Sequence, residues 1–593
     1  MCAISGFVSN NVSIDTDLLF SLSRDMSSRG PDSSGFWTSS NLIAHLAHQR
    51  LSILDLTTNG NQPMHSYNKR FSIVFNGEVY NYKELKNELL LLGVVFKSNS
   101  DTEVILEYFN LFGVSTFSKI RGMFSIAIWD NFSNTLYLAR DTFGIKPLYY
   151  YVNDEYLIFS SQVRPLNKIL NKNISRNGIA SYLLWGHVNS PNSIYEEIYS
   201  LKPGHYIRYH NNNIEYIKYY DLRDLYFASV NTDIVSVKTS LIESIKYHLI
   251  SDQPVSLLLS SGIDSTALLS LAAEGGYKLN TFTLSFKEFK GSAFDESYYV
   301  NSIAKYYGSF HQNIFLDKDY FQQNKFRYFK DMDQPTIDGL NVWMISNFLK
   351  SFGIKVCLTG LGADEILFGY STFKKIRLLS NTLNNFKFLK SKSKLNLMFF
   401  DYLSILFNKK IKDLPFFSSD ITQIYYLVRA HFAYKELNQI VKYFNNLYGS
   451  AFIDIEFLNS YLEKELSSYK DDANDIQERL GTNFSISYLE SKIYMQNRLL
   501  IDNDWASMQN GVELRTPFVD LKFYKNFINN QIYHKYNSKK EIFINDKFDI
   551  PDFILHRKKS GFEIPSSIWA NLSSNMSSNF KFNRAISNLT HFL

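Results

Sequence analysis

The second residue constrains this chain more than any other feature, because Cys2 directly follows the initiator methionine. Removal of Met1 would leave a thiol and a free α-amine on the same residue. A free α-amine titrates at about 7.7–8.0, so near neutral pH part of it can accept a proton. A nucleophile with its own base beside it is what covalent catalysis requires. Taken alone, the pattern also fits an ordinary small residue after Met1, so the rest of the chain must decide.

Length and composition predict a multidomain cytoplasmic protein. The 593 residues are enough for several domains, and 45% hydrophobic with 20% charged residues favours large cores over global disorder. The net charge of +5 is mild, and no basic run predicts nucleic-acid binding. Two cysteines, Cys2 and Cys357, cannot form a disulfide framework, which fits a reducing compartment. No signal peptide or membrane span is recognisable, so neither a membrane nor a nucleic acid is expected as a partner.

The first third of the chain reads as β-rich. Short apolar segments alternate with Gly, Asn and Asp turn signals, a pattern typical of strands. The predicted strands cover residues 71–75, 124–129, 135–139 and 147–152. A helix is predicted between them, over residues 82–92.

The character of the sequence changes near Pro203 and Gly204. A helical pattern over 234–249 leads into strands that alternate with helices, which predicts a parallel sheet. The predicted strands of this part cover residues 255–259, 281–286 and 355–359. The region 374–469 reads as helical. The expected domains span residues 1–205 and 234–593, joined by a strand-rich connection over 206–233.

Polar side chains cluster at the ends of the predicted strands of the first domain. Asn76-Gly77 would usually be read as a turn dipeptide. Beside an N-terminal thiol, the same pair offers an amide and a backbone N–H that could bind an oxyanion. Arg50 could hold a carboxylate in a bidentate fork, and Glu78 and Asp101 could hold an ammonium group. An amino acid with a side-chain amide would satisfy all of these groups together.

Seven segments, in the same order, resemble the class II glutamine amidotransferase domain. They are residues 1–6, 29–32, 50–63, 75–81, 100–104, 122–130 and 139–150. The resemblance implies an N-terminal-nucleophile fold with two stacked antiparallel sheets between helices. It also implies that Cys2 attacks the carboxamide of glutamine, forms a γ-glutamyl thioester and releases ammonia, with Asn76 and Gly77 as the oxyanion hole. The residues that would bind glutamine are Arg50, Asn76, Gly77, Glu78 and Asp101.

A candidate phosphate loop follows the strand predicted over 255–259. Residues 260–265 lead from a buried strand into an apolar helix, and such a loop presents backbone N–H groups and hydroxyls where anions bind. The loop lacks the Gly-Lys-Ser/Thr ending of a Walker motif. Asp264 fits a phosphate site if a metal bridges it to the phosphates. The alternative is that the Ser and Asp side chains cap the following helix.

This loop resembles the Ser-Gly-Gly-x-Asp-Ser pyrophosphate loop of the ATP-pyrophosphatase superfamily, with Ser261 in place of the first glycine. Further segments complete a resemblance to glutamine-hydrolysing asparagine synthetases. They are residues 359–365, 368–370, 502–508, 513–520 and 557–562. The resemblance covers most of the chain and is weakest over 374–480 and after residue 569. It implies an α+β N-terminal-nucleophile sandwich followed by an α/β parallel-sheet ATP-pyrophosphatase domain.

The same resemblance implies a ligase that uses ATP and Mg²⁺. The residues that would bind ATP are Leu258, Leu259, Ser260, Ser261, Gly262, Ile263, Asp264, Ser265, Leu284, Thr359, Gly360 and Lys559. Asp264 and Asp364 would hold Mg²⁺, and Lys559 would neutralise the leaving pyrophosphate. An acceptor carboxylate would become an acyl-adenylate, and ammonia from the first site would displace AMP after crossing an internal, water-poor passage.

Two positions depart from the family pattern. Gln162 replaces an acid, and Leu361 stands where asparagine synthetases carry a glutamate that takes a proton from the attacking ammonia. Leucine cannot do this, so the acceptor stays open. Aspartate is the acceptor that the family implies, and the alternatives are sugar acids and natural-product or glycan precursors. A third interpretation is a paralogue that binds glutamine or nucleotide without synthesis. The expected partners are glutamine, ATP and the acceptor, with a homodimer left open.

Overall fold

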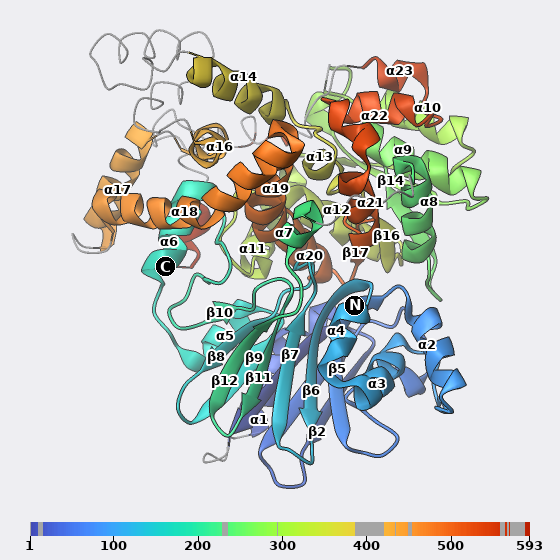
Figure 1. The fold of residues 1–593 in the computed structure, drawn as a ribbon, viewed down its shortest axis with the longest axis vertical. Coiled ribbons are helices and arrows are strands. Elements are labelled where there is room, and N and C mark those ends of the chain that lie inside the picture. The colour runs from blue at the N-terminus through green and yellow to red at the C-terminus, as the bar shows by residue number, and fades with distance from the viewer. Residues whose placement is uncertain are drawn as a thin grey trace.

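The computed structural model describes residues 2–9, 16–227, 235–292, 294–385, 420–432, 434–448 and 453–557, with 564–565, 569 and 587–592 near the C-terminus. Figure 1 shows a β-rich lower unit, coloured blue to cyan, and an upper unit in which helices surround a smaller sheet. The N-terminus lies at the border between the two units (Figure 1). The first residues of the chain therefore lie close to both units.

Two antiparallel sheets form the lower unit. Over the described residues, their strand orders are β10-β8-β9-β1-β3-β2 and β12-β11-β7-β6-β5-β4. The first sheet contains β1 (Ala3–Ser9), β2 (Ser33–Thr38), β3 (Ala44–Arg50), β8 (Tyr149–Val152), β9 (Tyr156–Ser160) and β10 (Tyr199–Ser200). The second contains β4 (Met64–His65), β5 (Phe71–Val79), β6 (Gly122–Asp130), β7 (Thr135–Arg140), β11 (His205–His210) and β12 (Asn213–Lys218). The expectation of stacked antiparallel sheets is confirmed, and the second sheet takes two strands from the segment expected as a connection.

The first strand is an internal strand with both faces buried. It lies between β9 and β3, and successive side chains face opposite sides of the sheet. Ile4 and Val8 pack between the two sheets, where Trp129 of the second sheet also lies. Phe7 packs on the outer face, in a cluster with residues of α1 (Thr16–Asp25) and α5 (Val163–Leu170). This burial fixes the start of β1, and with it Cys2, in one position.

Helices cover the outer face of the second sheet. Side chains of α2 (Tyr82–Leu91) and α3 (Asp101–Phe112) form one apolar cluster with β5 and β6. The other helices of the lower unit and its border are α4 (Thr116–Lys119), α6 (Arg176–Trp185) and α7 (Leu222–Phe227). The predicted helix over 82–92 and the predicted strands of this unit are confirmed.

A parallel sheet forms the centre of the upper unit. Within the described part of the chain its order is β15-β14-β13-β16-β17, and each neighbouring pair runs parallel. Its strands are β13 (Val255–Leu258), β14 (Asn280–Phe286), β15 (His311–Leu316), β16 (Val356–Leu358) and β17 (Glu513–Arg515). The first helices around it are α8 (Val237–His248), α9 (Ile263–Glu274), α10 (Ser297–Tyr306), α11 (Lys318–Asp331), α12 (Leu340–Ser351) and α13 (Ala363–Ile366). The predicted alternation of strands and helices is confirmed.

Further helices complete the upper unit. They are α14 (Ser371–Asn385), α16 (Ile421–Arg429), α17 (Tyr434–Tyr448), α18 (Ile455–Leu480), α19 (Thr482–Leu489), α20 (Leu500–Met508), α21 (Leu521–Asn529), α22 (Lys539–Asn545) and α23 (Asp552–Leu555). A π-helical segment, Glu490–Leu499, joins α19 to α20. The helical prediction for 374–469 is confirmed over α14, α16, α17 and the described part of α18 up to residue 469, and residues 386–419, 433 and 449–452 lie outside the described part. Among the described residues, no helix has the length and hydropathy needed to cross a bilayer.

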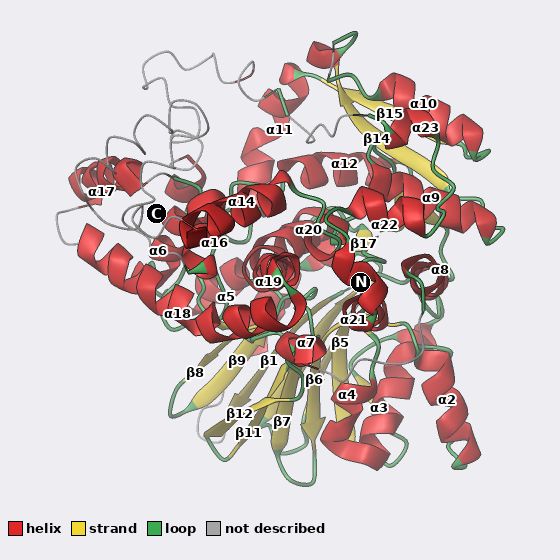
Figure 2. Ribbon diagram, turned by 45° about the horizontal axis from the view of Figure 1, so that its top comes forward, coloured by secondary structure: helices red, strands yellow, loops and turns green. Residues whose placement is uncertain are grey.

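The two units meet through a continuous apolar core and buried ion pairs. Figure 2 shows the yellow strands of the lower unit ending beneath α19 and α21. One hydrophobic cluster runs from Leu51 and Phe143 of the lower unit into the core around Leu257. Arg121 of the lower unit forms a bidentate ion pair with Asp520, with nitrogen–oxygen distances of 2.7 and 2.8 Å. A large apolar interface of this kind opposes independent movement of the two units.

The core between the two sheets generates a stability prediction. Leu138→Ala should lower the melting temperature by roughly 4–20 °C, because removing a fully buried leucine costs about 2–5 kcal/mol. The same substitution at Leu91, which is 89% exposed, is the matched control and should change stability by less than about 0.5 kcal/mol. Thermal unfolding followed by circular dichroism measures both. Equal shifts for the two variants would contradict the assigned core.

Candidate functional site

Cys2 directly precedes β1, and its backbone is held on both sides. Its N–H donates to Oδ1 of Asn76 at 3.1 Å, and its carbonyl oxygen accepts from Nε of Arg29 at 3.3 Å. The residue is only 8% exposed. Burial raises the pKa of the Cys2 thiol, and the nearby guanidinium of Arg50 acts in the opposite direction. The thiol is therefore buried and fixed in place.

Asn76 and Gly77 lie beside Cys2 on β5. The amide nitrogen of Asn76 donates to Oγ of Ser125 at 3.4 Å, and because an amide nitrogen carries two hydrogens, one remains for another acceptor. Gly77 is required for steric reasons. A Cβ at this position would lie 2.0 Å from the carbonyl oxygen of Met123 on the neighbouring strand. The turn interpretation of Asn76-Gly77 is wrong, because both residues lie inside a strand.

The other residues predicted to bind glutamine are also buried near β5. Nη1 of Arg50 donates to the carbonyl oxygen of Thr57 and to Oδ1 of Asn61, both at 2.8 Å. Glu78 pairs with Arg515 of the upper unit at 3.3 Å. Asp101, in the first turn of α3, accepts the N–H of Val79 at 2.9 Å. The structure thus brings all of the predicted residues to one region.

Burial shifts the acids of this region toward their neutral forms. It raises the pKa of Asp101 to about 6, against hydrogen bonds from Val79 and Thr102 that lower it. It also raises the pKa of Glu78 well above the ordinary value, with a further rise from the nearby carboxylate of Glu513. The guanidinium of Arg515 opposes this second shift. These carboxylates would gain from a cationic partner.

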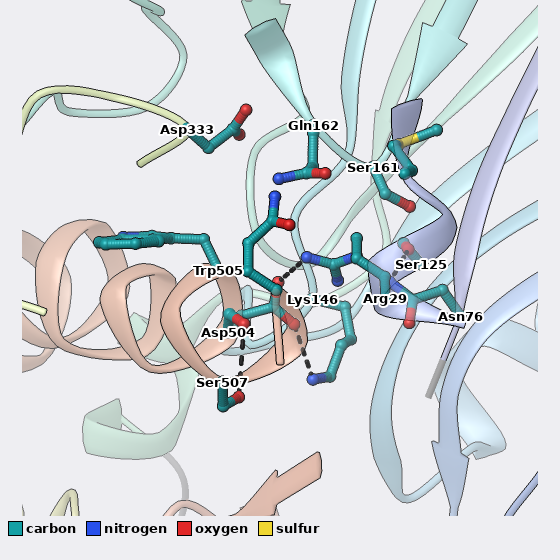
Figure 3. Close-up of polar contacts among 12 residues, drawn as sticks. Arg29, Asn76, Ser125, Lys146, Ser161, Gln162, Asp333, Asp504, Trp505 and Ser507 are labelled. Carbon is teal, nitrogen blue, oxygen red and sulfur yellow. Dashed lines mark hydrogen bonds and ion pairs between the residues drawn. The ribbon is translucent and has the colours of Figure 1, made fainter. Parts of the chain in front are cut away.

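A carboxylate of the upper unit reaches the surroundings of Cys2. Asp504 on α20 pairs with Nη1 of Arg29 at 2.8 Å and with Nζ of Lys146 at 2.9 Å (Figure 3). The three side chains are at most 1% exposed. Burial alone would raise the pKa of Asp504, but the two cations hold it below its ordinary value. Arg29 thus connects Asp504 directly to the carbonyl of Cys2.

An acid of the upper unit lies beside Gln162, the residue that replaces the family's acid. Gln162 precedes α5 and makes no side-chain cap hydrogen bond to that helix. Instead, Asp333 of the upper unit accepts the N–H groups of Val163 and Arg164, each at 3.0 Å. Burial raises the pKa of Asp333 to about 6. An acid from the second unit therefore caps α5, next to Gln162 (Figure 3).

A second cluster lies at the carboxyl ends of β13 and β16. The loop after β13 is ordered by its own hydroxyls, with Oγ of Ser260 and Oγ of Ser265 3.0 Å apart. The N–H of Gly262 donates to Oγ of Ser260 at 3.2 Å, and Gly262 precedes the first turn of α9. The N–H of Ser261 donates to Glu296 at 3.2 Å. The predicted arrangement of strand, loop and helix is confirmed.

The remaining residues predicted to bind ATP lie around this loop. Leu258 ends β13, Leu259 follows it, and Leu284 lies on the adjacent strand β14. Ile263 and Asp264 start α9. Thr359 follows β16, and a Cβ on Gly360 would lie 3.0 Å from Cβ of Asp264. The two loops therefore touch at the edge of the sheet.

Asp264 and Asp364 converge on the ammonium group of Lys539. Nζ of Lys539 lies 2.5 Å from Asp264 and also contacts Oδ1 of Asp364. Gly369 makes room for the second carboxylate, because a Cβ there would lie 1.9 Å from Oδ1 of Asp364. Two carboxylates that share one cation are a donor set that suits Mg²⁺, which takes a few carboxylates together with phosphate oxygens. The described residues hold no cluster of three or more His, Cys, Asp or Glu suited to a metal.

Another cation lies at the phosphate loop. Arg557 contacts Oγ of Ser261 and lies 3.5 Å from Glu296. Lys559, the cation that the sequence selects for this site, lies outside the described residues. Sequence reasoning overlooked Arg557, although the resembling segment 557–562 contains it. It also overlooked Lys539, which has no local signal because both of its partners are far away in the chain.

Comparisons with known proteins agree with both halves of the chain. Residues 1–220 match the family model described as glutamine amidotransferase domain, and residues 236–581 match the model described as asparagine synthase. The second match alone spans more than half of the chain. The chain belongs to the asparagine synthase family, and it is a glutamine-dependent carbon–nitrogen ligase.

Three individual proteins show how similar this chain is to known relatives. Asparagine synthetase [glutamine-hydrolyzing] 1 of Bacillus subtilis (strain 168) is 27% identical over 588 residues, covering 96% of this chain and 88% of the relative. A putative asparagine synthetase [glutamine-hydrolyzing] 2 of Methanocaldococcus jannaschii is 30% identical, covering 63% of this chain and 76% of the relative. Amidase chry2 of Gibberella zeae is 30% identical, covering 58% of this chain and 54% of the relative.

Solved structures show a remote likeness. A glutamine phosphoribosylpyrophosphate amidotransferase from B. subtilis, in complex with ADP and GMP, is 12% identical with a TM-score of 0.30. That match covers 60% of this chain and 81% of the solved chain. The chain described as the allosteric regulatory enzyme of purine biosynthesis is 13% identical, also with a TM-score of 0.30, over 53% of this chain and 80% of the solved chain.

The contact between Lys539 and the two carboxylates generates a prediction about stability. Lys539→Met should destabilise the protein by roughly 3–5 kcal/mol, because it leaves two largely buried carboxylates without their cation. Millimolar Mg²⁺ should recover part of this loss by taking the place of the ammonium group. Thermal unfolding with and without Mg²⁺ measures both effects.

Lys540→Met is the matched control, because it makes the same change at the neighbouring residue. It should leave the melting temperature and its response to Mg²⁺ unchanged. A Lys539→Met protein as stable as the control would show that the carboxylates need no cation from Lys539.

Proposed function

We propose that this protein hydrolyses glutamine at Cys2 and transfers the ammonia to an adenylated carboxylate in the upper unit. The observation that carries the proposal is the position of Cys2. A thiol that follows the initiator methionine starts a buried internal strand, with Asn76 and Gly77 beside it and the upper unit directly above. A structural cysteine has no need of this arrangement at the border of two units.

In this proposal the residues around Cys2 bind and orient glutamine. After removal of Met1, the α-amine of Cys2 serves as the base for its own thiol. Asn76, through its remaining amide hydrogen, and the backbone of Gly77 stabilise the oxyanion that forms on the carboxamide. Arg50 holds the carboxylate of glutamine, and Glu78 and Asp101 hold its ammonium group. The products of this half are glutamate and ammonia.

In the upper unit, the loop of residues 260–265 holds the phosphates of ATP, and Leu258, Leu259, Leu284, Thr359 and Gly360 surround the nucleotide. Asp264 and Asp364 would hold Mg²⁺, which would neutralise phosphate charge there. Arg557, together with the expected Lys559, offsets the negative charge of the leaving pyrophosphate. The acceptor carboxylate receives the adenylyl group, and ammonia then displaces AMP. The continuous apolar core between the units supports transfer of ammonia away from water.

Aspartate is the acceptor we propose first, because the B. subtilis and M. jannaschii relatives are described as asparagine synthetases. Leu361 favours a second candidate, in which the same chemistry acts on another carboxylate such as a sugar acid or a natural-product precursor. A leucine cannot take a proton from the attacking ammonia, so another group or the solvent must do so. A binding protein without synthesis is disfavoured, because Cys2, Asp264 and Asp364 would have no task in it.

The first test separates the two sources of ammonia. Cys2→Ala should abolish AMP formation driven by glutamine and leave AMP formation driven by ammonium salts, because the upper site requires only ammonia. Production of AMP and of the amidated acceptor is followed by mass spectrometry on protein that lacks Met1. If the variant still uses glutamine, the assignment of Cys2 is wrong.

A second test uses the pKa of Asp101. If its carboxylate holds the ammonium group of glutamine, the KM for glutamine should rise as the pH falls through about 6, because protonation removes the charge. Asp101→Asn should raise KM above about pH 6, where the native carboxylate is charged, and should abolish this dependence. Asp154→Asn, the same change at an exposed residue between β8 and β9 of the same unit, is not expected to alter it; steady-state glutaminase assays between pH 5 and 8 measure both. A KM that stays constant in the native protein over this range would exclude the role of Asp101.

A further inference from the structure

The backbone of Cys2 depends on a residue of the upper unit. Two hydrogen bonds orient it, one from its N–H to Asn76 and one to its carbonyl from Arg29. Asn76 lies within β5 of the lower unit, so the paired strands of that sheet hold it. Arg29 ends a short 3₁₀ turn, Ser27–Arg29, and its long side chain needs a separate anchor.

Asp504 supplies that anchor from α20. It pairs with Nη1 of Arg29 at 2.8 Å, while Nε of the same guanidinium faces the carbonyl of Cys2. Because a guanidinium is planar and rigid, fixing one edge fixes the direction of the other. Lys146 holds the second oxygen of the carboxylate at 2.9 Å, so the position of Asp504 is itself determined (Figure 3).

We propose that Asp504 is a positioning residue for the Cys2 step and acts through Arg29. The inference rests on the proposed function, since it concerns the nucleophile of glutamine hydrolysis. Without the carboxylate, Arg29 can turn, the peptide plane after Cys2 loses its hydrogen bond, and the thiol moves relative to Asn76 and Gly77. The upper unit thus completes the site of the lower unit with a residue that never touches glutamine.

A rival explanation is that Asp504 only holds the units together. The ion pair between Arg121 and Asp520 provides a matched comparison, because it also joins the two units through a bidentate guanidinium contact. Its further partner is Glu243 of α8, and neither Arg121 nor Asp520 has a hydrogen bond or ion pair to Cys2, Asn76 or Arg29 in the described structure. A general loss of contact between the units should therefore affect Asp504→Asn and Asp520→Asn alike.

The test compares these two substitutions in the full-length protein without Met1. For Asp504→Asn we expect the kcat of glutamine hydrolysis to fall about 10- to 100-fold, the loss typical of a misplaced reacting group. The KM for glutamine should stay within about threefold, because Arg50, Glu78 and Asp101 are untouched. AMP formation from ammonium salts should stay within about twofold, and Asp520→Asn should retain both activities to the same extent. Equal losses in both activities, or equal effects of both substitutions, would overturn the proposal.

A second pair of variants keeps the test valid if Asp504→Asn does not fold. That substitution leaves two buried cations without a carboxylate, whereas Lys146→Met/Asp504→Asn keeps the single net positive charge of the native trio. Lys146→Met alone keeps the pair between Arg29 and Asp504 and serves as the reference. The double variant should show the same fall in kcat relative to Lys146→Met, and a kcat equal to that of the reference would refute the proposal.

Alkylation of Cys2 by iodoacetamide gives a readout that needs neither ATP nor an acceptor. Burial raises the pKa of the Cys2 thiol and the guanidinium of Arg50 lowers it, so a thiol that has moved within this site should react with a changed pH midpoint. We expect this shift in the double variant and no change in Asp520→Asn, with modification at residue 2 quantified by mass spectrometry. If the native protein does not hydrolyse glutamine, the proposed function fails, and an unchanged midpoint in the double variant separately contradicts the positioning role.

Discussion

The two units of this protein meet through buried ion pairs set in a continuous apolar core, and Asp504 forms two of these pairs. Asp504 is almost completely buried between Arg29 and Lys146, and a charge removed from water in this way is tolerated only when its partners are in place. The surfaces around it are apolar and continuous with both cores, so a shifted docking would leave ions unpaired in a dry environment. Apolar burial supplies most of the attraction between the two units, and the ion pairs favour one relative position of the two surfaces.

This relative position places two chemically different candidate sites on either side of the interface between the units. Below it, β1 is an internal strand, so the residue before it is held at the edge of a rigid sandwich. Above it, parallel strands end at a common edge, where the loops after β13 and β16 bring Asp264 and Asp364 to one cation. Ligand sites at the carboxyl ends of parallel strands follow from this geometry. In the proposed function, this arrangement separates the site that releases ammonia from the site that uses it.

Local patterns were enough to predict part of the secondary structure, and the family resemblance supplied most of the expected site residues. Strands such as β5 and β13 combine an apolar period with turn signals, and the loop at 260–265 is contiguous in the chain. The pairings of Arg29 with Asp504 and of Lys539 with Asp264 could not be predicted, because they join residues hundreds of positions apart. For the same reason, the sequence did not indicate that Asp333 of the upper unit caps α5. The sequence showed that Leu361 replaces the glutamate of asparagine synthetases, but the effect of this change on the reaction depends on which carboxylate is the acceptor.

The most direct test of the account follows the nitrogen atom. Glutamine labelled with ¹⁵N in its amide is supplied with MgATP, aspartate and an excess of unlabelled ammonium, and the amidated product is analysed by mass spectrometry. Transfer across a closed boundary predicts a product that carries mainly ¹⁵N. A product with the isotope ratio of the bulk ammonium would mean that ammonia equilibrates with solvent, and it would contradict the claim that the two units enclose one path.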